Sequence, residues 1–298
     1  MKLNIGYFAD GPWSHLAFDK IINDKDITIS FICVRFDTKD ETLKNYCTLY
    51  NIDYIKHENI NSEYFIKKVA TYKCDLFVSM SFNQIFKAEI INLPRLKIIN
   101  CHAGKLPFYR GRNILNWALI NDEKEFGITV HFVDEGIDTG DILYQKSYPI
   151  SDHDNYLSLL NISYKECASV LYDAIVLIKK ENVKITKQTD IHATGFYCSQ
   201  RKIGDEIINW DQTSRDIFNF VRAICKPGPM ARAFINDQEM KINKVEYIKD
   251  APVYKCLKGS ILQKNNSDFL VKTNDSFIRV IEYEYNGKFR VGDRFEIK

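Results

Sequence analysis

The sequence has 298 residues, of which 45% are hydrophobic and 27% are charged, values typical of a globular chain with a full apolar core. Its 41 basic and 39 acidic residues give a net charge of +2, which argues against a dedicated nucleic-acid binder. No stretch reaches the ~20 apolar residues of a membrane span, and the N-terminus lacks a signal-peptide core. We therefore expect a cytoplasmic protein with no membrane partner.

Strand-like and helix-like patterns alternate along the first 180 residues. Strands are expected at 3–9, 27–34, 52–55, 74–80, 96–100, 127–133 and 141–150. Helices are expected at 13–22, 39–50, 62–71, 87–91, 111–120 and 154–180, the last with a break near 161–163. This alternation predicts an α/β, Rossmann-like, largely parallel sheet with helices on both faces. The G-x-G-x-x-G fingerprint is absent, which disfavours a dinucleotide-dependent dehydrogenase.

The last third of the chain has a different pattern. Residues 183–205 are polar and lack periodicity, which indicates a connecting segment between a first domain at 1–182 and a second at 206–298. The second domain is expected to begin with a helix at 214–224, capped by Thr213 or Ser214. Short strands are then expected at 233–236, 240–247, 269–273 and 277–285, with a hairpin turn at 286–287 leading to a strand at 288–289. These strands predict a small β-rich, barrel-like domain.

The eight cysteines include no C-x-x-C pair, and several lie inside apolar runs such as 31–34. They are expected to be small buried thiols of a reducing compartment rather than disulfides or zinc ligands. No metal site is expected.

Three polar residues mark the chemically informative part of the chain. Asn100 and His102 end the strand near 96–100, and Asp138 lies in the acidic loop that follows the strand at 127–133. An amide can donate to an oxyanion, an imidazole can move a proton, and a carboxylate can orient or charge that imidazole. Together they suit acyl transfer to an amine. The alternatives are Asn100 as a turn residue, His102 as a hydrogen-bonded structural residue and Asp138 in a surface turn or a weak cation site. His131 is interpreted as structural.

Three motifs resemble the signature of the formyl-tetrahydrofolate-dependent formyltransferases: residues 100–102, Leu106-Pro107 with 109–111, and 136–141. The resemblance implies that Asn100, His102 and Asp138 are catalytic and that 10-formyltetrahydrofolate is the cosubstrate. It also implies that the folate lies across the strand ends, against loops 80–86 and 134–141. The implied folate-binding residues are Met80, Gln84, Ile85, Phe86, Asp134, Gly136 and Asp141.

Within this family the sequence is most similar to the enzymes that formylate nucleotide-linked amino-dideoxy sugars, with a dTDP-sugar for surface polysaccharide as the expected substrate. A diphosphate needs cations or backbone N–H groups, and a base needs a stacking partner. The implied substrate-binding residues are Tyr109, Arg110, Arg112, Asn113, Tyr197, Arg201, Lys202, Trp210 and Arg222. The alternative within the family is methionyl-tRNA formylation, and outside catalysis a folate- or nucleotide-binding regulator. The base, the sugar and homodimer formation stay open.

Overall fold

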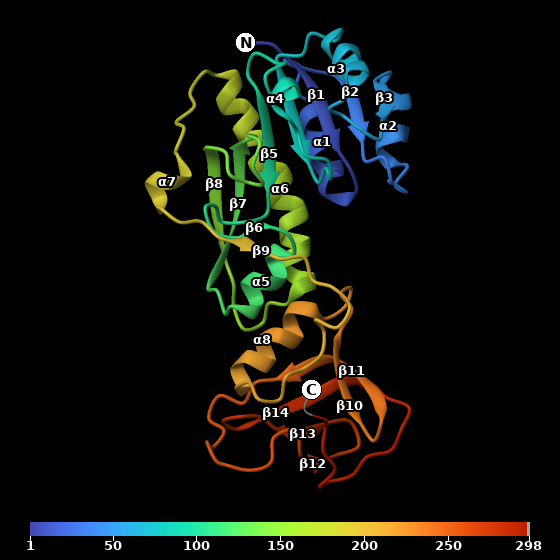
Figure 1. Ribbon diagram of the computed structural model, residues 1–298, viewed down its shortest axis with the longest axis vertical. Helices are drawn as coiled ribbons and strands as arrows, with labels where there is room; N and C mark the ends of the chain where they lie inside the picture. Colours follow the sequence, from blue (N-terminus) through green and yellow to red (C-terminus); the bar gives the residue numbers. More distant parts are fainter. Residues whose placement is uncertain (297–298) are drawn as a thin grey trace. The chain divides into compact units, whose positions relative to one another are not determined.

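The structure is a computed structural model and describes residues 1–296 (Figure 1). The chain divides into two compact units, each built from three segments. The first unit contains Met1–Arg112, Phe126–Tyr148 and Asn161–Cys198. The second contains Asn113–Glu125, Pro149–Leu160 and the chain from Ser199 onward. The domain limits expected from the sequence stay a prediction, and each unit is described by itself below.

A seven-stranded sheet in the described residues forms the first unit, in the order β3-β2-β1-β4-β5-β7-β8. Its strands are β1 (Leu3–Ala9), β2 (Ile27–Val34), β3 (Asp53–Lys56), β4 (Leu76–Met80), β5 (Ile98–His102), β7 (Glu125–Phe132) and β8 (Ile142–Pro149). The five strands from β3 to β5 are parallel, whereas β7 runs antiparallel to β5. The predicted α/β class is confirmed, with a reversal at β7.

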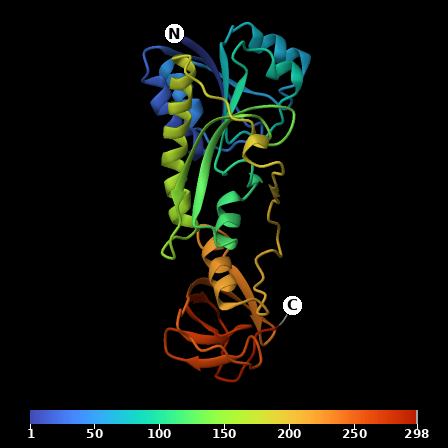
Figure 2. The same ribbon diagram turned by 90° about the vertical axis from the view of Figure 1, so that its left-hand side faces the viewer.

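Helices cover both faces of this sheet (Figure 2). They are α1 (Pro12–Ile22), α2 (Thr42–Tyr50), α3 (Glu63–Ala70), α4 (Ala88–Ile91) and α6 (Tyr156–Lys179). Neighbouring residues of β1 point to opposite faces, as strand geometry requires. The Tyr7 hydroxyl donates to the backbone oxygen of Ser14 in α1, at 3.0 Å, while the Phe8 ring packs 6.2 Å from that of Phe65 in α3. Helix α6 lies beside α1, with the rings of Trp13 and Tyr164 4.8 Å apart, and it is continuous where a break was expected.

Of the segment expected to connect the domains, residues 183–198 belong to the first unit. It contains α7 (Gln188–Ile191) and β9 (Tyr197–Cys198), and β9 pairs in parallel with the short strand β6 (Arg110–Gly111). The expected helix at 111–120 therefore starts later, as α5 (Ile114–Ile120), because residues 110–111 are taken up by this pairing. In the described part of the chain, no helix is long and apolar enough to cross a membrane.

The second unit combines α5 and α8 (Ser214–Ile224) with an antiparallel sheet in the order β10-β11-β14-β13-β12. The strands are β10 (Ala231–Ile235), β11 (Gln238–Glu246), β12 (Ile261–Lys264), β13 (Phe269–Lys272) and β14 (Phe277–Glu284). Thr213 caps α8 in a reciprocal capping box with Asp216, as predicted for one of two candidate residues. The prediction of a strand at 288–289 is wrong. Up to residue 296 no strand follows β14, and the Phe289 ring instead packs with its centroid 4.8 Å from that of Phe269.

Candidate active site

Strand β5 and the loop after β7 bring the three predicted catalytic residues together. Asn100 and His102 lie on β5, where Asn100 is opposite His131 of the antiparallel strand β7. Because β7 is antiparallel to β5, the carboxyl ends of these two strands lie at opposite edges of the sheet. The loop that follows β7 nevertheless returns Asp138 to these residues. The Asp138 carboxylate lies 3.6 Å from Nδ1 of His102 and 3.5 Å from Nε2 of His131.

Asp138 is an anion held among three positive or donating groups. Burial by itself raises the pKa of its carboxyl, but His102, His131 and the Gly111 N–H outweigh burial and hold that pKa well below its ordinary value. The Gly111 N–H donates to Oδ2 of Asp138 at 2.9 Å. Asp138 itself has φ of +55°, a left-handed conformation that non-glycine residues rarely adopt. The carboxylate therefore stays ionised at neutral pH in a loop conformation that needs outside support.

The His102 ring has an oxygen acceptor at each nitrogen. Its Nε2 lies 2.7 Å from the Tyr109 carbonyl oxygen, and because a carbonyl only accepts, Nε2 carries a proton. Its Nδ1 faces the Asp138 carboxylate. This environment is complementary to the doubly protonated imidazolium. Gly104 packs against the same ring, since an added Cβ would lie 2.4 Å from Nε2 of His102 and 2.4 Å from the Tyr109 oxygen.

His131 is a site residue that the sequence interpretation missed. Its ring is almost fully buried, and its Nδ1 lies 2.7 Å from the Phe132 carbonyl oxygen, which assigns a proton to Nδ1. Its Nε2 faces both the Asn100 amide nitrogen, at 3.3 Å, and the Asp138 carboxylate. In the neutral ring Nε2 accepts from Asn100, and in the charged ring it donates to Asp138. A polar residue on an otherwise apolar, buried strand beside the Asn-x-His motif was the available signal.

The two loops expected to hold folate are built differently. In 80–86, both polar atoms of the Gln84 side chain are engaged by the neighbouring segment 57–60: its oxygen accepts from the Ile60 N–H at 3.0 Å, and its amide nitrogen donates to the His57 carbonyl oxygen at 2.9 Å. The Phe86 ring is buried against Phe8, with centroids 5.1 Å apart, so its ring belongs to the core rather than to a ligand surface. Ile85 is exposed, and Met80 is buried at the end of β4.

The loop 134–141 is closed by its own side chains. The Asp134 carboxylate accepts from the Gly136 N–H at 3.1 Å and from the Thr139 hydroxyl. The Asp141 carbonyl oxygen accepts from the Phe132 N–H at 2.9 Å. Residues 134–137 remain exposed, which leaves the backbone of this loop open to a ligand. For both loops, folate binding through backbone groups stays a prediction.

Four of the residues predicted to bind substrate lie together in the first unit. The Arg110 guanidinium lies 5.5 Å above the half-exposed ring of Tyr197 and donates twice to the Gln188 side-chain oxygen. The Tyr109 ring is buried, and its carbonyl oxygen is the one that faces His102. Arg112 is exposed, and its N–H donates to the Cys198 carbonyl oxygen at 3.2 Å.

The other residues predicted to bind substrate belong to the second unit. The exposed Asn113 accepts, through its side chain, from the Arg201 N–H at 2.9 Å, and Lys202 is exposed. Two predictions are wrong. Trp210 cannot stack on a base because it is 1% exposed, with its ring 4.9 Å from that of Phe295. Arg222 cannot serve a diphosphate because its buried guanidinium is engaged by internal oxygens. These acceptors are Oδ1 of Asn219 and the carbonyl oxygens of Ser151 and Asp154.

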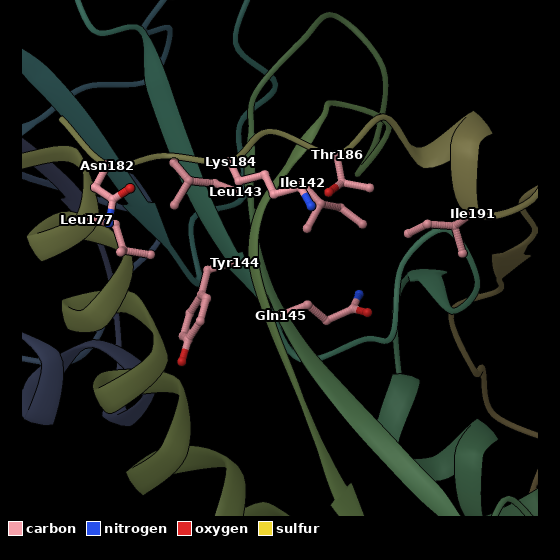
Figure 3. Close-up of a pocket in the computed structure, with 9 residues that line it drawn as sticks. All are labelled: Ile142, Leu143, Tyr144, Gln145, Leu177, Asn182, Lys184, Thr186 and Ile191. Atoms are coloured by element: carbon pink, nitrogen blue, oxygen red, sulfur yellow. The ribbon is translucent and has the colours of Figure 1, made fainter.

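A separate cavity of about 450 Å³ lies along β8, between the end of α6 and the segment that leads to α7 (Figure 3). Its lining residues are Ile142, Leu143, Tyr144, Gln145, Leu177, Asn182, Lys184, Thr186 and Ile191. None of Asn100, His102 and Asp138 lines it. In the described residues no cluster of three or more potential metal ligands from His, Cys, Asp and Glu is present.

Comparison with known proteins assigns the family. Residues 33–175 match the formyl transferase model, and residues 202–292 match that of the formyl transferase C-terminal domain. The chain belongs to the formyltransferase family. As a member it is an enzyme of formyl transfer, which confirms the resemblance seen in the sequence.

The relatives of this formyltransferase differ in their substrates. A methionyl-tRNA formyltransferase from Thermodesulfovibrio yellowstonii is 33% identical over 78% of this chain and 72% of its own length. One from Halothermothrix orenii is 29% identical over 98% of this chain and 96% of its own. Among solved structures, the sugar 3N-formyltransferase WlaRD, crystallised with dTDP and 5-N-formyl-THF, has a TM-score of 0.70 at 23% identity, covering 97% of this chain and 100% of that one. The similarity to WlaRD shows a shared fold.

Proposed function

We propose that this formyltransferase moves a formyl group from 10-formyltetrahydrofolate to the primary amine of a nucleotide-linked amino-dideoxy sugar, with dTDP as the first nucleotide to test. The convergence of Asn100, His102 and Asp138 carries the proposal of amine formylation. An incoming amine is itself the nucleophile, so the site needs an oxyanion donor and proton-transfer groups but no activated serine or cysteine. We further propose that the reaction takes place in the cytoplasm and that its product is used in the biosynthesis of a surface polysaccharide.

The proposed mechanism assigns one task to each residue. The amine nitrogen bonds to the formyl carbon, and the Asn100 amide donates a hydrogen bond to the oxyanion that forms. The His102 imidazolium, whose two N–H groups face Tyr109 and Asp138, stabilises the oxyanion through its positive charge. Asp138 holds the imidazolium and assists transfer of the amine proton to the folate nitrogen as the carbon–nitrogen bond to the folate breaks. His131 fixes the orientation of the Asn100 amide, so that its second N–H is available to the oxyanion.

Charge pairing in the second unit supports a small nucleotide rather than tRNA. From residue 199 onward the sequence has 18 Lys and Arg against 14 Asp and Glu, an excess of only four cations. Many of these cations already pair with carboxylates of the same unit, whereas tRNA binding needs cations that are available to phosphates. The paired cations include Arg215, Arg222, Lys226, Arg232, Lys258, Arg279 and Arg290.

Two solved sugar formyltransferases support the same substrate class. WlaRD carries dTDP, and the N-formyltransferase from Helicobacter canadensis, with a TM-score of 0.69 and 22% identity, is in complex with folinic acid and dTDP-3-aminofucose. The second candidate function is methionyl-tRNA formylation. It is favoured by the sequence relatives, which reach 33% identity and are methionyl-tRNA formyltransferases.

Paired substrates separate these functions. The enzyme is incubated with 10-formyltetrahydrofolate and either dTDP-3-aminofucose, a dTDP-4-amino-4,6-dideoxyhexose or methionyl-tRNA, and formylated product is measured by mass spectrometry. We expect turnover of a dTDP-amino sugar and none of methionyl-tRNA. Turnover of methionyl-tRNA alone, with binding that weakens steeply as salt rises, would establish the second function instead.

A further inference from the structure

Gln188 has every hydrogen-bonding group of its side chain occupied inside the first unit. Its oxygen accepts from Nε of Arg110 at 3.1 Å and from Nη2 at 2.7 Å. Its amide nitrogen donates to the carbonyl oxygens of Asp138, at 2.9 Å, and of Gly140, at 2.8 Å. The residue is 4% exposed. A glutamine amide offers two donors and one oxygen with two lone pairs, so this arrangement is complete.

The chain reaches this position by running along the edge of the sheet. Thr186 forms an antiparallel bridge with Ile142, the first residue of β8, with N···O distances of 2.8 and 2.9 Å. Figure 3 shows Thr186 next to Ile142 at the rim of the cavity. Gln188 follows two residues later, as the first residue of α7, where its side chain meets the loop 134–141 just ahead of Ile142.

The partners of Gln188 belong to two segments, each of which contacts the proposed catalytic residues. One is the backbone of Asp138, whose left-handed φ of +55° needs support from its surroundings. The other is Arg110, which lies between the Tyr109 carbonyl that faces His102 and the Gly111 N–H that binds the Asp138 carboxylate. Gln188 therefore joins the two segments whose relative position fixes the distance from Asp138 to His102.

We propose that Gln188 is a positioning residue that holds Asp138 in register with His102 for formyl transfer. The proposal rests on the function assigned to Asp138 above. Gln188 lies 50 residues from Asp138 in sequence and touches no reacting atom, so it acts only through the loop that it fixes. A displacement of about 1 Å at a catalytic group can lower turnover by about 100-fold.

Two substitutions separate its contacts. Gln188→Met keeps the side-chain length but removes all four hydrogen bonds, and we expect kcat to fall by about 10- to 100-fold with little change in KM. Gln188→Glu keeps an acceptor for Arg110 but sets a carboxylate against two carbonyl oxygens, so a similar loss is expected. Thr189→Ala, an exposed neighbour in α7, is the matched control and should leave kcat unchanged.

A double-mutant cycle distinguishes positioning from a general structural role. If Gln188 acts through the Asp138 carboxylate, Gln188→Met should lower kcat by less than threefold in an Asp138→Asn background, where that carboxylate is already lost. A loss of the same size in both backgrounds would overturn the proposal. Thermal unfolding and far-UV circular dichroism of each variant establish that the compared enzymes are folded.

Hydrogen exchange tests the same inference without a substrate, and so independently of the proposed function. The Gly111 N–H is protected by Asp138, so we expect its exchange to accelerate at least tenfold in Gln188→Met and to be unaffected in Thr189→Ala. Unchanged protection of Gly111 would overturn the inference. Faster exchange without any turnover of the dTDP-amino sugars would leave the positioning role in place and contradict only the substrate assignment.

Discussion

Replacing Asp138 by Asn removes the negative charge that faces both imidazoles while keeping the size of the side chain. At an effective dielectric constant of about 20, a carboxylate 3.6 Å from the His102 imidazolium stabilises it by about 4–5 kcal/mol. Since about 1.4 kcal/mol corresponds to a factor of ten, losing this stabilisation in the transition state lowers kcat by about 10³-fold. We therefore expect Asp138→Asn to be a folded enzyme with very slow formyl transfer.

Single-turnover formyl transfer at saturating 10-formyltetrahydrofolate measures this loss, because it excludes slow product release. Asp190→Asn, the same change at an exposed position of α7, is the control and should leave the rate unchanged. A rate for Asp138→Asn within tenfold of wild type, in a protein with an unaltered circular dichroism spectrum, would refute the proposed role of the carboxylate.

Three further predictions concern packing and charge. Gly104→Ala puts a methyl group 2.4 Å from Nε2 of His102, so we expect a loss in kcat of at least tenfold and about 1–3 kcal/mol of destabilisation in urea unfolding. Trp210→Phe retains a buried ring, so the KM for a dTDP-amino sugar should stay within twofold in steady-state assays, whereas a tenfold rise would restore Trp210 as a ligand. Burial raises the pKa of Asp122, but its hydrogen bonds with Arg215 and Lys124 outweigh burial and lower that pKa to about 2. Ionised Asp122 therefore stabilises the fold above its unfolded pKa of about 4, and this stabilisation is lost as the pH falls toward 2. Asp122→Asn should flatten the acid limb of the stability–pH curve measured by circular dichroism, and an unchanged limb would contradict the pairing.

Local patterns predicted much of this fold because they depend on nearby residues. The α/β alternation set the sheet and its helices, and Thr213 was recognisable as a cap from its position before an amphipathic run. The reversal of β7 was not predictable from its composition, since an antiparallel strand buried on both faces has the same apolar run as a parallel one. The strand expected after the Asn286-Gly287 turn failed because Phe289 buries its ring in the core instead of continuing the sheet.

The candidate site was predictable only in part for a related reason. Asn100 and His102 are fixed by one strand, but the contacts of Asp138 depend on a loop that is held by residue 188, far away in sequence. A glutamine in a polar, aperiodic stretch gives no sign of such a contact. Trp210 and Arg222 were wrongly predicted to bind substrate. An aromatic ring can stack, and a guanidinium can donate hydrogen bonds, inside a domain as well as on a ligand.

The ionised Asp138 carboxylate contributes both to the stability of the fold and to the proposed reaction. A group whose pKa is lower in the folded than in the unfolded state stabilises the fold at neutral pH, so the ionised carboxylate contributes to stability above its unfolded pKa of about 4. His102 and His131 contribute most to keeping it ionised, and the hydrogen bond from the Gly111 N–H also helps to hold its left-handed backbone. Because the carboxylate and the imidazolium that it holds are fixed by the protein before any substrate binds, little reorganisation is needed when negative charge develops on the oxyanion.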